Sequence, residues 1–139
     1  MAFLQAINEF QNDPALSARY QFWVFLYPTG RTIVLSALRL RTALGRADAA
    51  HGSDPAFHQM VIVGHSLGGI LAHMVVSDSG REVWDGAFNV PPELMRASPP
   101  TRALLDQLLF YGPLPYVRRV VFIATPHRGS RLASGVVGR

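Results

Sequence analysis

The sequence predicts an α/β fold, a three-layer α/β/α sandwich around a mostly parallel sheet. Apolar segments typical of strands alternate along the chain with segments of helical periodicity, and this order favours parallel strands joined by right-handed crossovers. The predicted strands are continuous apolar runs, as in strands that are covered on both faces. Only three such strands are visible, so we expect a single domain over residues 1–139 whose sheet is incomplete.

The first half of the chain predicts helix, strand and helix. Residues 3–10 repeat apolar side chains at helical spacing, and Asp13-Pro14 ends this pattern. Residues 20–27 are dense in aromatic and β-branched side chains and lead into a Pro-Thr-Gly turn, which predicts a buried strand. Residues 33–44 return to helical spacing, and Gly45 is the expected end of that helix. A polar loop is expected over 48–54.

The second half predicts strand, helix, an irregular segment, helix and strand. Residues 59–63 are a short apolar strand, and 67–77 form an amphipathic helix. Residues 78–100 are rich in glycine and proline, and Thr101 caps a helix over 101–110. Within 79–115 we expect a cap-like excursion, whose apolar side chains either cover a binding pocket or pack onto the core. Residues 117–124 are the third strand, and the tail after 125 has no assignment.

The sharpest signal is the sequence G-H-S-L-G at 64–68, which fills the pattern G-x-S-x-G and is followed by Gly69. A strand before it and a helix after it are the context in which this pattern places a nucleophilic serine on a tight turn. Ser66 is therefore expected in a strained conformation at the carboxyl end of its strand. Gly64 and Gly68 are expected because a Cβ at either position collides with the neighbouring strand or helix.

The helix that follows supplies the second chemical element. The N–H of Leu67 has no acceptor inside the helix, so it is available to stabilise the oxyanion of a tetrahedral intermediate. His65 is adjacent to the serine in such a turn and is expected to point away from it, so it is not the expected base. A phosphate-binding loop requires G-x-x-x-x-G-K-[ST] or G-x-G-x-x-G, and the sequence contains neither.

Three segments resemble the α/β-hydrolase superfamily of serine lipases and esterases. M-V-I-V-G-H-S-L-G-G at 60–69 is similar to the nucleophile elbow of these enzymes, and F-I-A-T-P-H-R-G-S at 122–130 is similar to the segment after their next strand. Residues 20–30 resemble the preceding strand and loop of bacterial hydrolases similar to the inositol-deacylase-like lipases. The resemblance implies that Ser66 is the nucleophile and that Leu67 provides one oxyanion N–H. It also implies that Thr125, Pro126 and His127 lie on a loop near the pocket, with His127 ordering that loop and not serving as the triad histidine.

The chain departs from the family pattern in two ways. The family's acid and histidine follow strands further along the sheet, and nothing beyond Arg131 offers either residue type. The second oxyanion donor belongs to a loop after a strand upstream of Tyr20, where only a helix-like stretch is found. The chain is therefore expected to be a fragment.

Neither the carboxylates nor the histidines that follow Ser66 are expected to complete a triad. The carboxylates are Asp78, Glu82, Asp85, Glu93 and Asp106, and the histidines are His73 and His127. Asp78 and Glu82 are expected at the amino end of the sheet. His73 is expected as a partly buried or surface residue within a helix, and Asp106 on a solvated helix face.

Composition excludes several other functions. The chain has no cysteine, which removes disulfides, thiolate metal sites and a cysteine nucleophile. Its net charge is +4, but its basic residues are all arginines scattered along the chain, so no nucleic-acid partner is expected. Neither a signal peptide nor a spanning segment is visible, which makes the cytoplasm the default location. No metal or cofactor is expected, and the oligomeric state is not predicted.

The predicted function is hydrolysis of a carboxylic ester, on a small-molecule or lipid substrate, through an acyl-enzyme on Ser66. Without a base the serine hydroxyl is a weak nucleophile, so low activity is expected of this chain by itself. Two alternatives stay open. One is a non-catalytic binding or interaction domain that keeps the elbow, and the other is acyl transfer or thioester cleavage by the same serine.

Overall fold

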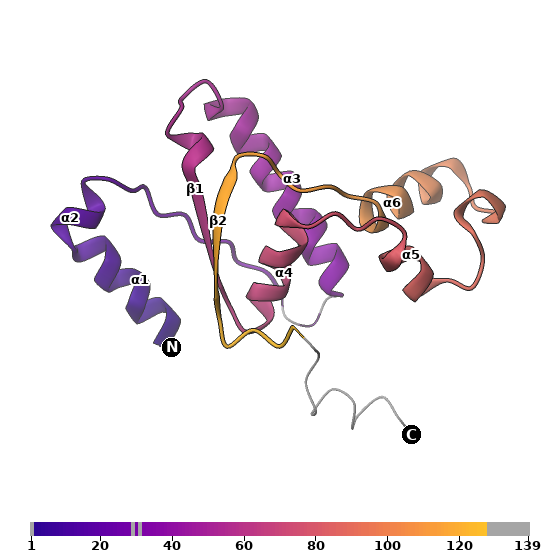
Figure 1. The fold of residues 1–139 in the computed structure, drawn as a ribbon, viewed down its shortest axis with the longest axis horizontal. Helices are drawn as coiled ribbons and strands as arrows, with labels where there is room; N and C mark the ends of the chain where they lie inside the picture. Colours follow the sequence, from indigo (N-terminus) through magenta and orange to yellow (C-terminus); the bar gives the residue numbers. More distant parts are fainter. Residues whose placement is uncertain (1, 29, 31, 128–139) are drawn as a thin grey trace.

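The computed structural model describes residues 2–28, 30 and 32–127. The elements follow one another as α1 (Ala2–Asn12), α2 (Pro14–Ser17), α3 (Ile33–His51), η1 (Phe57–Gln59), β1 (Met60–His65), α4 (Leu67–Val76), α5 (Glu82–Ala87), η2 (Pro92–Leu94), α6 (Pro99–Leu109) and β2 (Val117–Ile123). Strands β1 and β2 pair in parallel in a two-stranded sheet (Figure 1). The coarse prediction of mixed helices and parallel strands is therefore confirmed.

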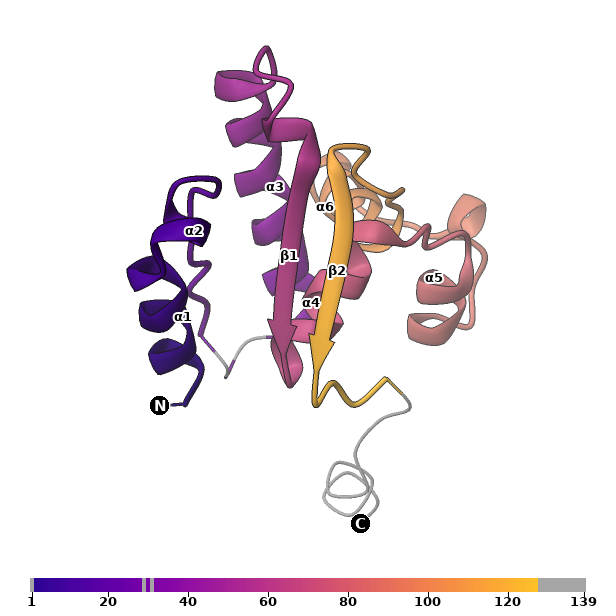
Figure 2. The same ribbon diagram turned by 60° about the vertical axis from the view of Figure 1, so that its left-hand side comes forward.

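Helices α3 and α4 cover one face of this sheet (Figures 1 and 2). The side chains that alternate toward them from β1 are half-buried or buried, whereas Val61 and Val63 on the opposite face are exposed. The buried core joins α3, α4 and the residue before β2, and it consists of Ala37, Leu40, Leu44, Leu71, Met74, Val75 and Tyr116. Helices α1 and α2 lie outside this core, beyond β1 (Figures 1 and 2).

The strand predicted over 20–27 is not formed, because this segment makes no sheet hydrogen bonds with the strands that the structure describes. Phe25 and Tyr27 lie partly buried against the core cluster, and the ring of Trp23 is 6.3 Å from that of Phe57. Tyr20, Trp23, Val24 and Leu26 are about half exposed or more. The prediction of a buried strand was therefore wrong in its backbone pairing and, for these side chains, in burial. Thr29, in the predicted turn after it, lies outside the described residues.

Two helix boundaries differ from the prediction, because Gly45 does not end its helix and Thr101 is not the cap of the next one. Helix α3 continues through Gly45 to His51, because the following residues are good helix formers and outweigh the roughly 1 kcal/mol cost of one helical glycine. Helix α6 begins at Pro99, with the Ser98 side chain accepting from the Thr101 N–H. Proline is compatible with a first helical turn, so the predicted Thr101 cap was too late by three residues. The segment 78–100 was expected to be irregular but contains α5 and η2.

The two ends of the excursion over 79–115 are hydrogen-bonded to each other and to the end of α4, and this joined region is called the neck. Ser79 and Tyr111 are linked by backbone and side-chain hydrogen bonds of 2.9 Å, and the Leu114 N–H donates to the Val75 carbonyl at 2.9 Å. Arg41 of α3 ties the neck to the main core. Its guanidinium donates to the carbonyls of Met74 at 3.0 Å and Gly112 at 2.8 Å.

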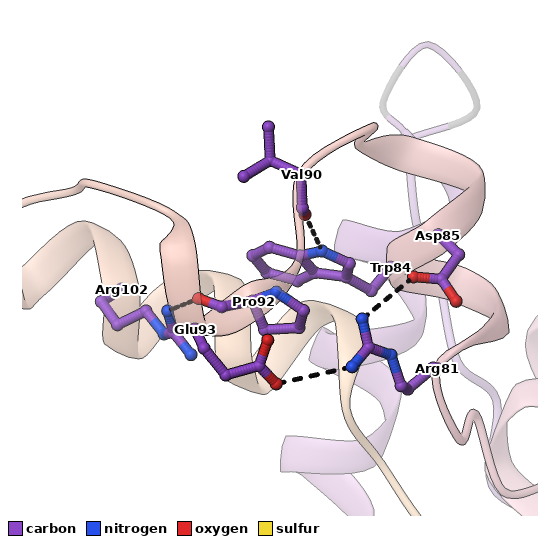
Figure 3. Close-up of polar contacts among 7 residues, drawn as sticks. All are labelled: Arg81, Trp84, Asp85, Val90, Pro92, Glu93 and Arg102. Atoms are coloured by element: carbon purple, nitrogen blue, oxygen red, sulfur yellow. Dashed lines mark hydrogen bonds and ion pairs between the residues drawn. The ribbon is translucent and has the colours of Figure 1, made fainter.

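Beyond this neck, α5 and α6 lie on the far side of α4 from the sheet (Figure 1). Trp84 is fully buried there, and its indole N–H donates to the Val90 carbonyl at 2.7 Å (Figure 3). The Trp84 ring also stacks on Phe110 and contacts Phe88, at centroid distances of 5.6 and 4.8 Å. The excursion thus has a small aromatic core of its own. Its role as a cap over a pocket stays a prediction.

Tyr116 offers a pH-dependent test of the main core. Its side chain is 5% exposed, and its hydroxyl has no hydrogen-bond partner among the residues that the structure describes. Burial raises the pKa of Tyr116, and the carboxylate of Asp48 raises it further while Arg41 partly opposes this. The folded state therefore holds the phenolic proton more tightly than the unfolded state, whose tyrosine pKa is about 10. This contribution to stability is present below pH 10 and is lost as the pH rises through the folded-state pKa.

We therefore expect Tyr116→Phe to leave the free energy of unfolding at pH 7 unchanged or raised by about 1 kcal/mol, since it removes a buried hydroxyl without a partner. Above pH 10 the free energy of unfolding of Tyr116→Phe is expected to exceed that of the unchanged protein by an increasing amount, because the variant lacks the phenol that titrates. Urea unfolding at pH 8 and pH 11 checks both statements. A constant difference between the two proteins at both pH values contradicts the second.

Candidate active site

Ser66 lies between β1 and α4, at the carboxyl end of the sheet. Strand β1 ends at His65 and α4 begins at Leu67, so one residue makes the whole connection. Ser66 has φ 51° and ψ −122°, and its side chain is exposed. A non-glycine residue at positive φ costs about 1–3 kcal/mol, and such strain gathers at functional sites. The strand, the helix and the strained serine are as predicted.

Hydrogen bonds on both sides hold this conformation. The Ser66 N–H donates to the Ile123 carbonyl at 2.9 Å, which extends the pairing with β2 by one residue. The Ser66 carbonyl accepts from the Gly69 N–H at 3.0 Å, which starts the first turn of α4. The backbone is thus fixed from the strand side and from the helix side.

Close packing of β1 against α4 requires two of the glycines. A Cβ added to Gly64 would lie 2.6 Å from the Gly69 Cα and 2.8 Å from the Gly68 carbonyl oxygen. A Cβ on Gly69 would lie 1.8 Å from the Thr125 Oγ1. The expectation for Gly68 was wrong, because its Cβ would meet only the Tyr27 hydroxyl, at an ordinary contact of 3.5 Å. The constrained pair is Gly64 and Gly69.

Leu67 is the first residue of α4, so its N–H is one of the donors that a helix leaves without an internal acceptor. The positive end of the helix dipole lies at the same place. Both features would stabilise a negative charge that develops next to Ser66. The role of Leu67 as an oxyanion donor stays a prediction.

A hollow of about 280 Å³ lies along the same helix, lined by Ile70, His73, Pro126 and His127. Ile70 and His73 are three residues apart on α4, so they lie on the same face of that helix. Pro126 and His127 come from the loop after β2. That Thr125, Pro126 and His127 lie near the substrate pocket of Ser66 stays a prediction. Arg128, Gly129 and Ser130, the end of the predicted loop segment, lie outside the described residues.

The two histidines of this hollow face each other. Their ring centroids are 5.8 Å apart, and the ring of His127 meets that of Phe122 edge-on at 4.6 Å. Two helical turns separate His73 from Ser66, which is about 10 Å along the axis. The packing of His127 on Phe122 fits a residue that orders its loop. Phe122 contacts both histidine rings and was missed by sequence reasoning, although its strand position opposite Gly64 places it on the side that α4 covers.

Ala124 at the end of β2 is a second strained residue, with φ 49°. It is followed by a tight turn in which the His127 N–H donates to the Thr125 carbonyl at 3.0 Å. Sequence reasoning did not single out Ala124, because alanine carries no signal for positive φ. The carboxyl ends of both strands therefore carry a non-glycine residue in this conformation.

Four of the five carboxylates after Ser66 have partners elsewhere in the part of the chain that is described, and the fifth, Glu82, lies at the start of α5. Asp106 pairs with Arg102 at 3.0 Å, and both Asp85 and Glu93 pair with Arg81. Asp78 follows the end of α4 and accepts from the Gly80 N–H at 2.7 Å. These positions agree with the expectation that none of them serves Ser66.

The described residues contain no group of three or more histidine and carboxylate side chains placed to hold a metal ion. None of the described helices is long and apolar enough to cross a membrane. Comparisons of the chain with family models, with curated proteins and with solved structures gave no match.

Proposed function

We propose that the chain carries the nucleophile half of a serine ester hydrolase, with Ser66 as the attacking residue in an α/β-hydrolase core. The observation that carries the proposal is an exposed, non-glycine residue at φ 51° between a strand and the first turn of a helix. In the proposed reaction the Ser66 Oγ bonds to the acyl carbon of the ester. The alcohol then leaves with a proton, and water cleaves the acyl-enzyme to release the acid.

The finer fold proposal is a three-layer sandwich. Val61, Val63, Val121 and Ile123 are 39–45% exposed on the sheet face opposite α3 and α4. Apolar side chains on a parallel sheet are normally covered on both faces. The exposed face therefore supports a further layer on this side, as in a complete hydrolase core.

The proposal predicts that a fluorophosphonate probe labels Ser66. We expect one probe adduct by intact-mass measurement, which is lost in Ser66→Ala and kept in the control variant Ser53→Ala, whose side chain lies exposed in a loop. Labelling is expected to be slow, because neither histidine that follows Ser66 is expected to be its base, and His73 lies two helical turns away from it. Labelling of equal extent in Ser66→Ala, or none after prolonged exposure, argues against a reactive serine.

The same expectation, that neither histidine serves as the base, favours a second candidate, a non-catalytic binding domain that keeps the elbow geometry. It predicts no adduct, together with saturable binding of an ester analogue. Acyl transfer or thioester cleavage by Ser66 is separated from ester hydrolysis by product analysis with competing alcohol and thioester substrates.

A further inference from the structure

A second hollow lies at the opposite end of the sheet from Ser66. It has a volume of about 220 Å³ and is lined by Tyr20, Gln59, Val61, Arg118 and Arg119. The distance along β1 from Val61 to Ser66 is about 16 Å at the usual strand rise, so the two sites are separate. The lining residues come from three parts of the chain: the segment after α2, the residues that lead into β1, and the start of β2.

A bulge in β2 is what brings the two arginines together. Met60 pairs with Val117 and Val61 pairs with Arg119, so Arg118 is the extra residue in the ladder. In a regular strand, adjacent side chains point to opposite faces of the sheet. A bulge redirects side chains, and bulges are frequent beside functional sites. Here both arginines line the same hollow.

The charges in this hollow are not neutralised. Within the described part of the chain, neither Arg118 nor Arg119 has a carboxylate within ion-pair distance, whereas Arg81 has two and Arg102 has one. Both side chains are exposed to solvent at the sheet face. Two guanidinium groups with five N–H donors each, next to a phenol and a carboxamide, form a set of donors that suits an oxyanion.

We propose that this hollow binds a phosphoryl group. A phosphate monoester carries about −1.5 to −2 charges at pH 7 and three acceptor oxygens, which matches two guanidinium groups better than a single carboxylate does. The hollow is several times the roughly 30 Å³ that one water occupies, so it has room for the group and part of what it is attached to. The group belongs either to a small soluble molecule or to a lipid headgroup. This inference does not depend on the role of Ser66, but it requires that a further layer on this sheet face leave the hollow beside Val61 open.

The test is a calorimetric titration of the full chain at about 0.15 M salt, where nonspecific attraction is screened. The probes are inorganic phosphate, glycerol 3-phosphate, and vesicles of phosphatidylcholine with or without phosphatidic acid. We expect saturable binding to a single site for at least one phosphoryl probe. Binding of the soluble probes identifies a small-molecule site, whereas binding confined to phosphatidic acid vesicles identifies a headgroup site.

Single-residue variants assign the binding to this hollow. Arg118→Gln and Arg119→Gln are each expected to weaken it about 10-fold or more, since each removes charge-assisted hydrogen bonds. Arg119→Lys keeps the charge but not the fork geometry, so an intermediate loss is expected. Arg46→Gln, on the exposed surface of α3, makes the same charge change and is expected to alter affinity less than 2-fold. Absence of saturable binding to all probes overturns the proposal, as does an equal loss in Arg46→Gln.

Discussion

Replacing Gly69 with alanine is expected to destabilise the chain by roughly 3 kcal/mol or more, the largest effect that the elbow geometry predicts. The new Cβ would lie 1.8 Å from the Thr125 Oγ1 and 2.7 Å from the Thr125 Cβ, so the loop after β2 must move away from α4. Because this loop also carries His127, the movement is expected to open the hollow that His127 lines with Ile70 and His73. Urea unfolding measures the stability loss directly.

Two controls separate this clash from the general effect of losing a glycine. Gly68→Ala adds the same methyl group one residue earlier, where it meets only an ordinary contact at 3.5 Å, and it is expected to change stability by less than about 1 kcal/mol. Thr125→Gly removes the three atoms nearest to the new methyl group, so it is expected to restore part of the loss when combined with Gly69→Ala. Additive effects of Gly69→Ala and Thr125→Gly would show that the two residues do not meet as described.

The elbow could be predicted from the sequence because its constraints are local. One residue between a strand and a helix must turn sharply, and the glycine pattern around Ser66 indicates that turn without knowledge of distant contacts. The part that was wrong, the role of Gly68, depends on what lies across from it. Gly69 is constrained by Thr125, more than fifty positions away, and no periodicity in the sequence gives this contact.

The difference between local constraints and contacts with distant residues also explains why the strand predicted over 20–27 is not formed. Aromatic and β-branched residues at 20–27 have strong strand propensity, but a strand exists only when a neighbour accepts and donates its backbone hydrogen bonds. Phe25 and Tyr27 bury their rings against the core without such pairing. Propensity therefore predicted the partial packing of Phe25 and Tyr27, but neither the pairing nor the burial of the whole segment, since Trp23 and Leu26 are 52% and 82% exposed. Similarly, the adjacent arginines at 118 and 119 are visible in the sequence, whereas the bulge that aims both at one hollow is not.

The second large effect is expected at Trp84, the largest fully buried side chain. Trp84→Ala is expected to cost about 3–5 kcal/mol, because it empties the centre of the small aromatic core between α5 and α6. It also leaves the Val90 carbonyl without the indole N–H that now donates to it at 2.7 Å (Figure 3). Trp84→Phe keeps most of the ring packing and loses this hydrogen bond, so an intermediate cost of about 1–2 kcal/mol is expected.

Trp23 provides a matched control of the same residue type. It is 52% exposed, so Trp23→Ala is expected to cost well under half as much as Trp84→Ala. The location of the damage is as informative as its size, because hydrogen bonds tie the excursion to the main core at its neck and at Arg41, and α6 also lies against α3. If the excursion is a separate cooperative unit, Trp84→Ala is expected to accelerate amide hydrogen exchange throughout α6 while the amides of β1 and β2 keep their protection. Equal loss of protection in α6 and in the sheet would show that the two cores unfold as one, and the excursion would then be an integral part of the domain.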